Sequence, residues 1–354
     1  MVVADVLLNH RTLTRAVNLI KTPADFLQTL LFSDHEPVAT DTIELSYLDG
    51  DREAAPFVKK NGGSILVAGD DSTFATVSAP NIRISANLDP SKLIEERRPG
   101  DLVFVDGSDV LDSAQRYIAQ RQSRMKERIN HTIEVLCSQL IQGQIKYQVD
   151  GQDNFQITLP RDAGHSITLS GGAEWNGGTA TSIHILEDIK TAKSLVADKL
   201  GMAPTDVILG SEAATYFTRN AEIRGLLQVP GNILVGSLDF TQQYAKSGAL
   251  FLGRVGGLNF WEYGRQINVN GVATSLIRAK YAEFVTTDPS AETVIYYAAI
   301  PDIDAIESGE FIGEIFSKTW TLPDPSVRKL LLHSRPLPWM RKANAFVSMK
   351  VISG

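Results

Sequence analysis

Residues that could bind a metal are scattered along the chain. There is one cysteine, Cys137, and the six histidines are His10, His35, His131, His165, His184 and His333. No two histidines have the spacing of a metal-binding pair, and none lies close to Cys137. Zinc sites use several such ligands at short, defined spacings, so the sequence predicts no metal site. Asp302 and Asp304 could bind a cation, but we expect a loop pair of this kind to be solvated.

The serines and the glycine-rich segments form no catalytic motif. The chain has no Gly-x-Ser-x-Gly sequence. Ser211 lies between a predicted strand and a predicted helix, where we expect it to cap the helix. Residues 253–257 (GRVGG) lack the Gly-Lys-Ser/Thr ending of a phosphate-binding loop, and no predicted helix follows them. The sequence therefore predicts no catalytic residue and no cofactor.

Positive charge is concentrated on one predicted helix, although the chain as a whole is acidic. The basic stretch consists of Arg116, Arg121, Arg124, Lys126 and Arg128. These side chains could contact enclosed nucleic acid or an acidic neighbour, and the simpler interpretation is a solvated helix face. The net charge of −7 argues against a dedicated nucleic-acid binder, which usually has a basic excess.

Length and composition describe an ordinary globular protein. The 354 residues suffice for two domains or for one large elaborated domain. A hydrophobic fraction of 43% can supply a sizeable core. A single cysteine cannot form an intrachain disulfide, which favours a cytosolic protein. No signal peptide is visible, and no apolar run approaches the ~20 residues of a membrane helix, so we expect no membrane association.

The strongest local pattern predicts a long helix over residues 110–142. Apolar residues recur on one helical face, at Leu111, Ala114, Ile118, Met125, Ile129, Ile133, Leu136 and Leu140. Cys137 lies beside this stripe, so we expect it to be buried rather than reactive. Such a helix would be about 50 Å long, enough to cross a whole domain.

The remaining elements predict a mixed α+β chain. Helices are expected at residues 13–20, 183–200 and 211–219, and strands at 41–48, 64–68 and 81–85. Residues 49–85 are rich in turn-forming residues and predict a long two-stranded arm. Asp150-Gly151 and Asn270-Gly271 predict hairpins. Further strands are expected at 207–209, 258–263, 266–269, 275–278, 293–299, 315–321, 326–334 and 345–352, with Pro336 and Pro338 interrupting the last two.

In this order, several segments resemble a known family. They are residues 55–58 (APFV), 61–63 (NGG), the long helix, 167–175 (ITLSGGAEW), 318–320 (KTW), 324–325 (DP) and 346–351 (FVSMKV). The chain is similar to the lambda-type major head proteins of bacteriophages, the major capsid protein E family. The resemblance covers nearly the whole chain, and the Ser-Gly-Gly-Ala-Glu-Trp run is its most specific part. It implies the capsid fold named after phage Hong Kong ninety-seven.

The resemblance also implies a division of the chain. Residues 1–45 would form an N-terminal arm, and 46–92 the extended β arm, or E-loop. Residues 93–178 would form the peripheral domain, with the spine helix at 110–142. Residues 179–312 would form the axial domain, and 313–354 would return to the peripheral domain.

The function implied is a major capsid protein of the virion. The chain would assemble with itself into hexamers and pentamers of an icosahedral head, in the host cytoplasm, around double-stranded DNA without sequence-specific binding. A portal protein and a separate scaffolding protein would be partners, and the sequence leaves a decoration protein open. Candidate subunit contacts are Phe57, Val58, Lys59, Lys60, Ile65 and Phe74 on the arm, Arg116, Arg121, Arg124 and Arg128 on the helix, and Trp175. One member of the wider fold forms covalent crosslinks from an arm lysine, but no acidic catalyst or asparagine partner is identifiable here.

Three alternatives remain from the sequence. An encapsulin-like compartment would have the same fold and would package a cargo enzyme instead of DNA. An unrecognised hydrolase would have its site in the α/β region that begins at Thr179. The sequence contains no recognisable set of catalytic residues, which disfavours this alternative. A phage tail component is disfavoured by the long helix and the β arm.

Overall fold

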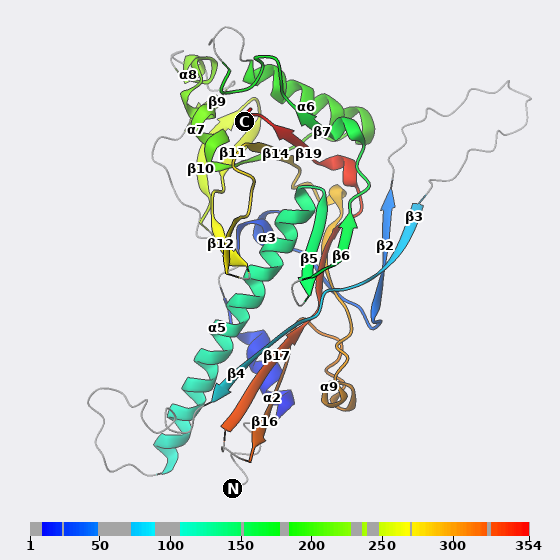
Figure 1. Cartoon of the computed structure of the whole chain (residues 1–354), viewed down its shortest axis with the longest axis vertical. Helices are drawn as coiled ribbons and strands as arrows, with labels where there is room; N and C mark the ends of the chain where they lie inside the picture. Colours follow the sequence, from blue (N-terminus) through cyan, green and yellow to red (C-terminus); the bar gives the residue numbers. More distant parts are fainter. Residues whose placement is uncertain are drawn as a thin grey trace, which may run out of the picture.

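The computed structural model describes residues 9–22, 25–48, 72–88, 107–149, 152–177, 184–227, 236–238, 248–269, 271–323 and 327–353. The long helix α5 (Gly107–Ile141) crosses much of the molecule (Figure 1). At 1.5 Å per residue its 35 residues span about 52 Å. The predicted apolar stripe is buried from Met125 to Leu140, and the chain turns at Gly143, whose φ of 97° suits glycine. The predicted spine helix is thereby confirmed.

The upper part of the molecule in Figure 1 is built on a seven-stranded sheet with the order β7-β19-β14-β8-β11-β10-β9. Its strands are β7 (Ser166–Thr168), β8 (Asp206–Leu209), β9 (Gly236–Leu238), β10 (Leu250–Val255), β11 (Leu258–Glu262), β14 (Tyr281–Val285) and β19 (Val347–Lys350). The helices α6 (Ile185–Leu200), α7 (Ser211–Arg219) and α8 (Ala221–Leu227) pack with it. Their core contains Ile185, Phe217, Phe260, Phe284 and Val347.

A larger core surrounds α5 and unites segments from both ends of the chain. The helices α2 (His10–Leu19) and α3 (Phe26–Leu30) contact α5. A three-stranded sheet joins β1 (His35–Pro37), β15 (Thr293–Tyr297) and β18 (Pro336–Met340). Apolar side chains from α2, α3, α5, β15 and β18 meet in one cluster, among them Val17, Leu27, Ile129, Ile295 and Leu337.

The lower part in Figure 1 has a three-stranded sheet beside α5, with the order β16-β17-β4. Its strands are β4 (Ile82–Leu88), β16 (Phe316–Leu322) and β17 (Val327–Ser334). The small helix α9 (Ile303–Ser308) precedes β16. Three hairpins complete the fold: β2 (Thr42–Leu48) with β3 (Ser72–Ser78), β5 (Gln144–Val149) with β6 (Gln152–Thr158), and β12 (Gln266–Val269) with β13 (Val272–Ser275).

Several local predictions need correction. Residues 82–88, predicted as part of the two-stranded arm, pair with β17, whereas β2 pairs with β3. Pro336 and Pro338 do not interrupt the sheet but lie in β18, an edge strand where a missing N–H is tolerated. The strand predicted at 275–278 is displaced to β13. Gly210, not Ser211, is the N-cap of α7. Both predicted hairpins are confirmed by the antiparallel pairing of β5 with β6 and of β12 with β13.

No helix in the described part of the chain is long and apolar enough to cross a lipid bilayer.

Candidate functional site

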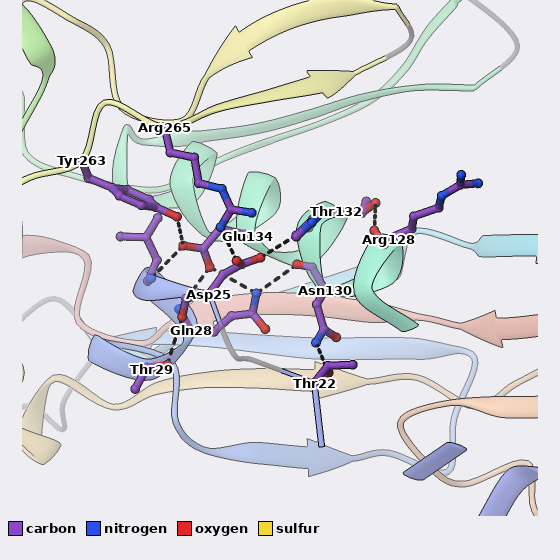
Figure 2. A network of polar contacts seen from close by, with 12 residues as sticks. Thr22, Asp25, Gln28, Thr29, Arg128, Asn130, Thr132, Glu134, Tyr263 and Arg265 are labelled. Carbon is purple, nitrogen blue, oxygen red and sulfur yellow. Dashed lines mark hydrogen bonds and ion pairs between the residues drawn. The ribbon is translucent and has the colours of Figure 1, made fainter. Parts of the chain in front are cut away.

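A buried polar junction connects the N-terminal segment, the long helix and the region after β11. At its centre is Glu134, whose side chain is shielded from solvent on α5. It accepts hydrogen bonds from the backbone N–H of Leu27 at 2.7 Å, from Gln28 and from the hydroxyl of Tyr263 at 2.9 Å (Figure 2). A buried carboxylate without partners would be strongly unfavourable, and these donors offset that cost. The junction therefore fixes three segments far apart in sequence.

Asp25 forms the second half of the junction. It is 4% exposed and accepts a hydrogen bond from Arg265, and His131 Nδ1 lies 2.9 Å from its other oxygen. Figure 2 shows Asp25 between α5 and the segment that carries Arg265. Burial raises the pKa of Glu134, the hydrogen bond from the Leu27 amide lowers it, and the charge of Asp25 raises it further. The two carboxyl groups can therefore lie close together in the junction, because hydrogen-bond donors surround each of them.

Lys126 anchors a second N-terminal element to α5. Its Nζ donates to the carbonyl oxygens of Val17 at 3.0 Å and Ile20 at 2.8 Å, where α2 ends. A cation at a helix C-terminus satisfies carbonyl groups that have no partner within the helix. Burial lowers the pKa of Lys126, and the charge of Glu314 opposes that shift. Lys126 thus does not belong to the solvated basic face predicted for it.

The arginines of α5 have different surroundings from Lys126. Arg116, Arg124 and Arg128 are exposed. Arg121 is half-buried, and its guanidinium donates to the hydroxyl of Tyr117 at 3.1 Å and lies over that ring. The helix therefore presents three exposed arginines on its surface and holds the fourth against its own tyrosine.

Trp175, predicted as a subunit contact, lies in the core. It is 2% exposed, its Nε1 donates to Asp188 Oδ2 at 2.9 Å, and its backbone N–H donates to Val351 at 2.8 Å. The glycine-rich loop therefore joins α6 to the C-terminal end of the chain. This burial leaves Trp175 almost no surface for a neighbouring subunit.

The arm candidates are only partly covered by the structure. Phe57, Val58, Lys59, Lys60 and Ile65 lie outside the described residues. Phe74 belongs to β3, opposite Ser46 of β2. At the base of the arm Ile43 and Leu45 are buried in the main core, and Trp339 Nε1 donates to the Ser46 carbonyl at 2.9 Å. The first strand of the arm is thus fixed to the body.

Residues considered for chemistry are separated or engaged elsewhere. Asp302 caps α9, and Asp302 and Asp304 form ion pairs with Lys318 at 2.7 and 2.8 Å. Asp302 is buried, which corrects the expectation of a solvated carboxylate there, whereas Asp304 is exposed as expected. Cys137 is fully buried, and burial raises the pKa of its thiol. Within the described ranges, no three His, Cys, Asp or Glu side chains lie close enough to hold a metal ion.

Asp25, Glu134 and Tyr263 were not among the residues predicted from the sequence to form a site. Glu134 had one visible indication, since it lies between Ile133 and Leu136 on the buried side of the long helix. A carboxylate in that position requires partners, but their identity cannot be read from the helix itself.

Comparison with known proteins identifies the fold and the family. The model of the family described as phage major capsid protein E matches residues 9–351. A solved structure assigned as the capsid protein of a prophage of Escherichia coli CFT073 has a TM-score of 0.70 at 16% identity, covering 98% of this chain and 99% of that one. A phage-related protein from Bordetella bronchiseptica RB50 has a TM-score of 0.52 at 13% identity, with 96% of each chain covered.

The mature capsid of bacteriophage PhiM1 is also similar, with a TM-score of 0.51 at 10% identity, covering 94% of this chain and 88% of that one. A search of curated proteins found no match. The structural likenesses confirm the predicted Hong Kong ninety-seven-type capsid fold. Because the family model spans nearly all residues of a chain with this fold, the protein belongs to the phage major capsid protein E family.

Proposed function

We propose that this capsid protein forms hexamers and pentamers that close into an icosahedral phage head around double-stranded DNA. The observation that carries the proposal is the family match over residues 9–351. The geometry supports it, because a subunit with a long helix and a body-anchored arm offers extended edges to its neighbours. Individually weak contacts suffice in a closed symmetric shell, since many of them act together.

We infer that the function resides in surfaces and that the chain has no catalytic role. The inference is supported by the buried position of Cys137 and by the ion pairs of Asp302 and Asp304 with Lys318. The proposed partners are further copies of the chain, a portal protein and a separate scaffolding protein, with a decoration protein as an optional addition. Assembly would take place in the host cytoplasm, before the protein becomes part of the virion.

The arm is the proposed interlocking element. Its first strand is held to the body by Ile43, Leu45 and Trp339. Contacts between the rest of the arm and a neighbouring subunit would therefore fix the position of the whole subunit relative to that neighbour. Exposed arginines on α5, namely Arg116, Arg124 and Arg128, are proposed as a second contact surface, toward DNA or an acidic neighbour.

Electron microscopy of the purified full chain, alone and with its candidate scaffolding protein, tests the proposal. Icosahedral shells, or rings of five and six subunits, are the expected result. Nuclease-protected double-stranded DNA in particles from infected or induced cells distinguishes a phage head from a protein compartment. A monodisperse monomer under every condition, together with turnover of generic ester or phosphate substrates, would contradict it.

An arm variant makes the test specific. Deleting residues 50–80 would also remove β3, which pairs with β2 along its length. Replacing only residues 51–70 with a Gly-Ser linker retains both strands. We expect this variant to be folded, with a thermal unfolding curve like that of the wild type, but unable to form shells. Shells of normal size from this variant would exclude the arm as the interlocking element.

A further inference from the structure

A polar pocket lies where the end of α5, the β5–β6 hairpin and the seven-stranded sheet meet. Its volume is about 480 Å³. Three cationic residues line it: Lys146 from β5, Arg161 from the segment after β6, and Arg278 from the segment before β14. The hydroxyl-bearing residues Thr158 and Ser166 also line it. No part of the proposed shell function accounts for this concentration of positive charge.

Arg161 has more hydrogen-bonding capacity than its surroundings use. Its Nη2 donates to the carbonyl of Ile141, the last residue of α5, at 2.7 Å. Its Nε and Nη1 are enclosed and have no hydrogen-bond partner among the described residues. Burial lowers the pKa of Arg161, and the charge of Glu283 opposes the shift. Glu283 supplies one negative charge, and that charge also faces Arg278, so the two guanidinium groups together keep a net positive charge that a bound anion could neutralise.

Among the described residues, one carboxylate forms an ion pair with a cation of the pocket: Glu283 pairs with Arg278. Its Nη2 donates to Glu283 Oε1 at 3.0 Å and to Ser348 Oγ at 2.9 Å, and its guanidinium lies 3.5 Å from the centre of the Tyr281 ring. Its Nε has no partner among the described residues. Glu283 is 1% exposed, so it faces the arginines rather than solvent. Lys146 adds a further positive charge from an exposed position, and the pocket keeps an excess of positive charge.

We propose that this pocket binds a phosphate-type oxyanion, held by the charges of Arg161 and Arg278 in its wall and of Lys146 at its exposed side. Arginine pairs and lysine are the side chains that recognise phosphate oxygens, and the pocket is large enough for the ion with part of its hydration. The phosphate group could come from free phosphate or from the backbone of nucleic acid. Bound there, it would link the end of α5, the hairpin and the seven-stranded sheet.

Titration of the unassembled full chain with inorganic phosphate, at pH 7.5 and constant ionic strength maintained with KCl, tests the proposal without depending on shell formation. We expect a saturable rise in Tm, because a ligand that binds only the folded chain stabilises it. Lys146→Gln and Arg161→Gln should each weaken the apparent Kd about tenfold, the loss of one charged partner. Lys146 is exposed, so its variant reports on binding even if Arg161→Gln impairs folding. Arg254→Gln, which removes an exposed charge on β10, should bind phosphate like the wild type.

A second arm of the experiment adds a 20-base-pair DNA duplex. Nucleic acid is the source of the phosphate group if the duplex displaces inorganic phosphate from the wild type and no such displacement is seen with Lys146→Gln or Arg161→Gln. If the duplex does not compete, free phosphate is the source. The proposal is overturned if phosphate gives no saturable change, if both pocket variants bind like Arg254→Gln, or if acetate binds more tightly than phosphate.

Discussion

The hydroxyl of Tyr263 donates a hydrogen bond to Glu134 across 2.9 Å, although 129 positions separate the two residues in the chain. Glu134 lies on the long helix, and Tyr263 follows the strand β11 of the seven-stranded sheet. The ring of Phe26 packs against the ring of Tyr263, with 5.1 Å between the ring centroids. This packing brings the N-terminal segment into the same junction. This polar centre therefore connects the end of β11 and the N-terminal segment to the long helix within the larger core.

Removing the carboxylate should destabilise the protein strongly. Glu134→Ala leaves the amides of Leu27 and Gln28 and the Tyr263 hydroxyl without their acceptor, so we expect a loss of about 3–5 kcal/mol in the free energy of unfolding. Tyr263→Phe removes one donor and should cost about 1–2 kcal/mol. Urea unfolding measures both. The exposed Glu307→Ala is the control, expected within about 0.5 kcal/mol of wild type. Equal stability of Glu134→Ala and the control would refute the anchoring role.

Replacing Lys126 with methionine should release α2 from the long helix. The change removes the two hydrogen bonds that Lys126 donates to the carbonyl oxygens of Val17 and Ile20 at the end of α2, and we expect a cost of about 2 kcal/mol. Amide hydrogen exchange should accelerate within α2 more than within α5. Arg124→Met is the matched control, because that side chain is exposed on the same helix. Similar exchange rates for α2 in both variants would show that Lys126 does not hold it.

Stability should depend on pH through Asp188. Burial raises the pKa of Asp188 to about 6, the hydrogen bond from Trp175 lowers it, and the charges of Glu187 and Glu222 raise it. A folded-state pKa above the unfolded value means that the folded chain binds the proton more tightly. This contribution to stability is therefore complete below about pH 4 and lost as pH rises through about 6.

The comparison of wild type with Asp188→Asn isolates this effect. Between pH 5 and 7.5 the wild type should lose about 1 kcal/mol relative to the variant, a value reduced for partial exposure of the carboxylate. Urea unfolding at the two pH values gives the difference. If wild type and variant respond identically to pH, the carboxylate does not have the raised pKa.

The exposed arginines of α5 should matter for assembly but not for folding. Replacing Arg116, Arg124 and Arg128 together with glutamine should change the free energy of unfolding by less than about 1 kcal/mol, because none is buried. We expect the yield of DNA-containing shells to fall several-fold. Electron microscopy and nucleic-acid content per particle provide the measurement. A normal yield of filled particles would mean that this helix face is only solvated.

The sequence was informative wherever structure depends on neighbours along the chain. The spacing of Met125, Ile129, Ile133 and Leu140 predicted α5, because residues three and four apart share a helix face. Asn270-Gly271 and Asp150-Gly151 predicted two hairpins through their turn chemistry, and the run from Ile167 to Trp175 carried the resemblance to the capsid family.

Strand partners were harder to infer. The strand β4 follows the arm directly, but it pairs with β17, and the paired residues lie 240 to 252 positions apart in the chain. Pro336 and Pro338 were predicted to interrupt the strands, but both lie in the edge strand β18, where a backbone N–H is not needed to pair with a further strand. Pairing depends on which distant edge is available, and the strand's own residues do not encode that edge.

The polar junction was determined by tertiary structure alone. The sequence by itself specified a mixed α+β chain with a long helix, since periodicity and turn residues act locally. Only the folded chain decided that Glu134 meets Tyr263, that Asp25 meets Arg265, and that Lys126 leaves the basic face to bind the end of α2. Buried polar groups must find partners, but the partners are chosen by packing between segments more than 100 residues apart.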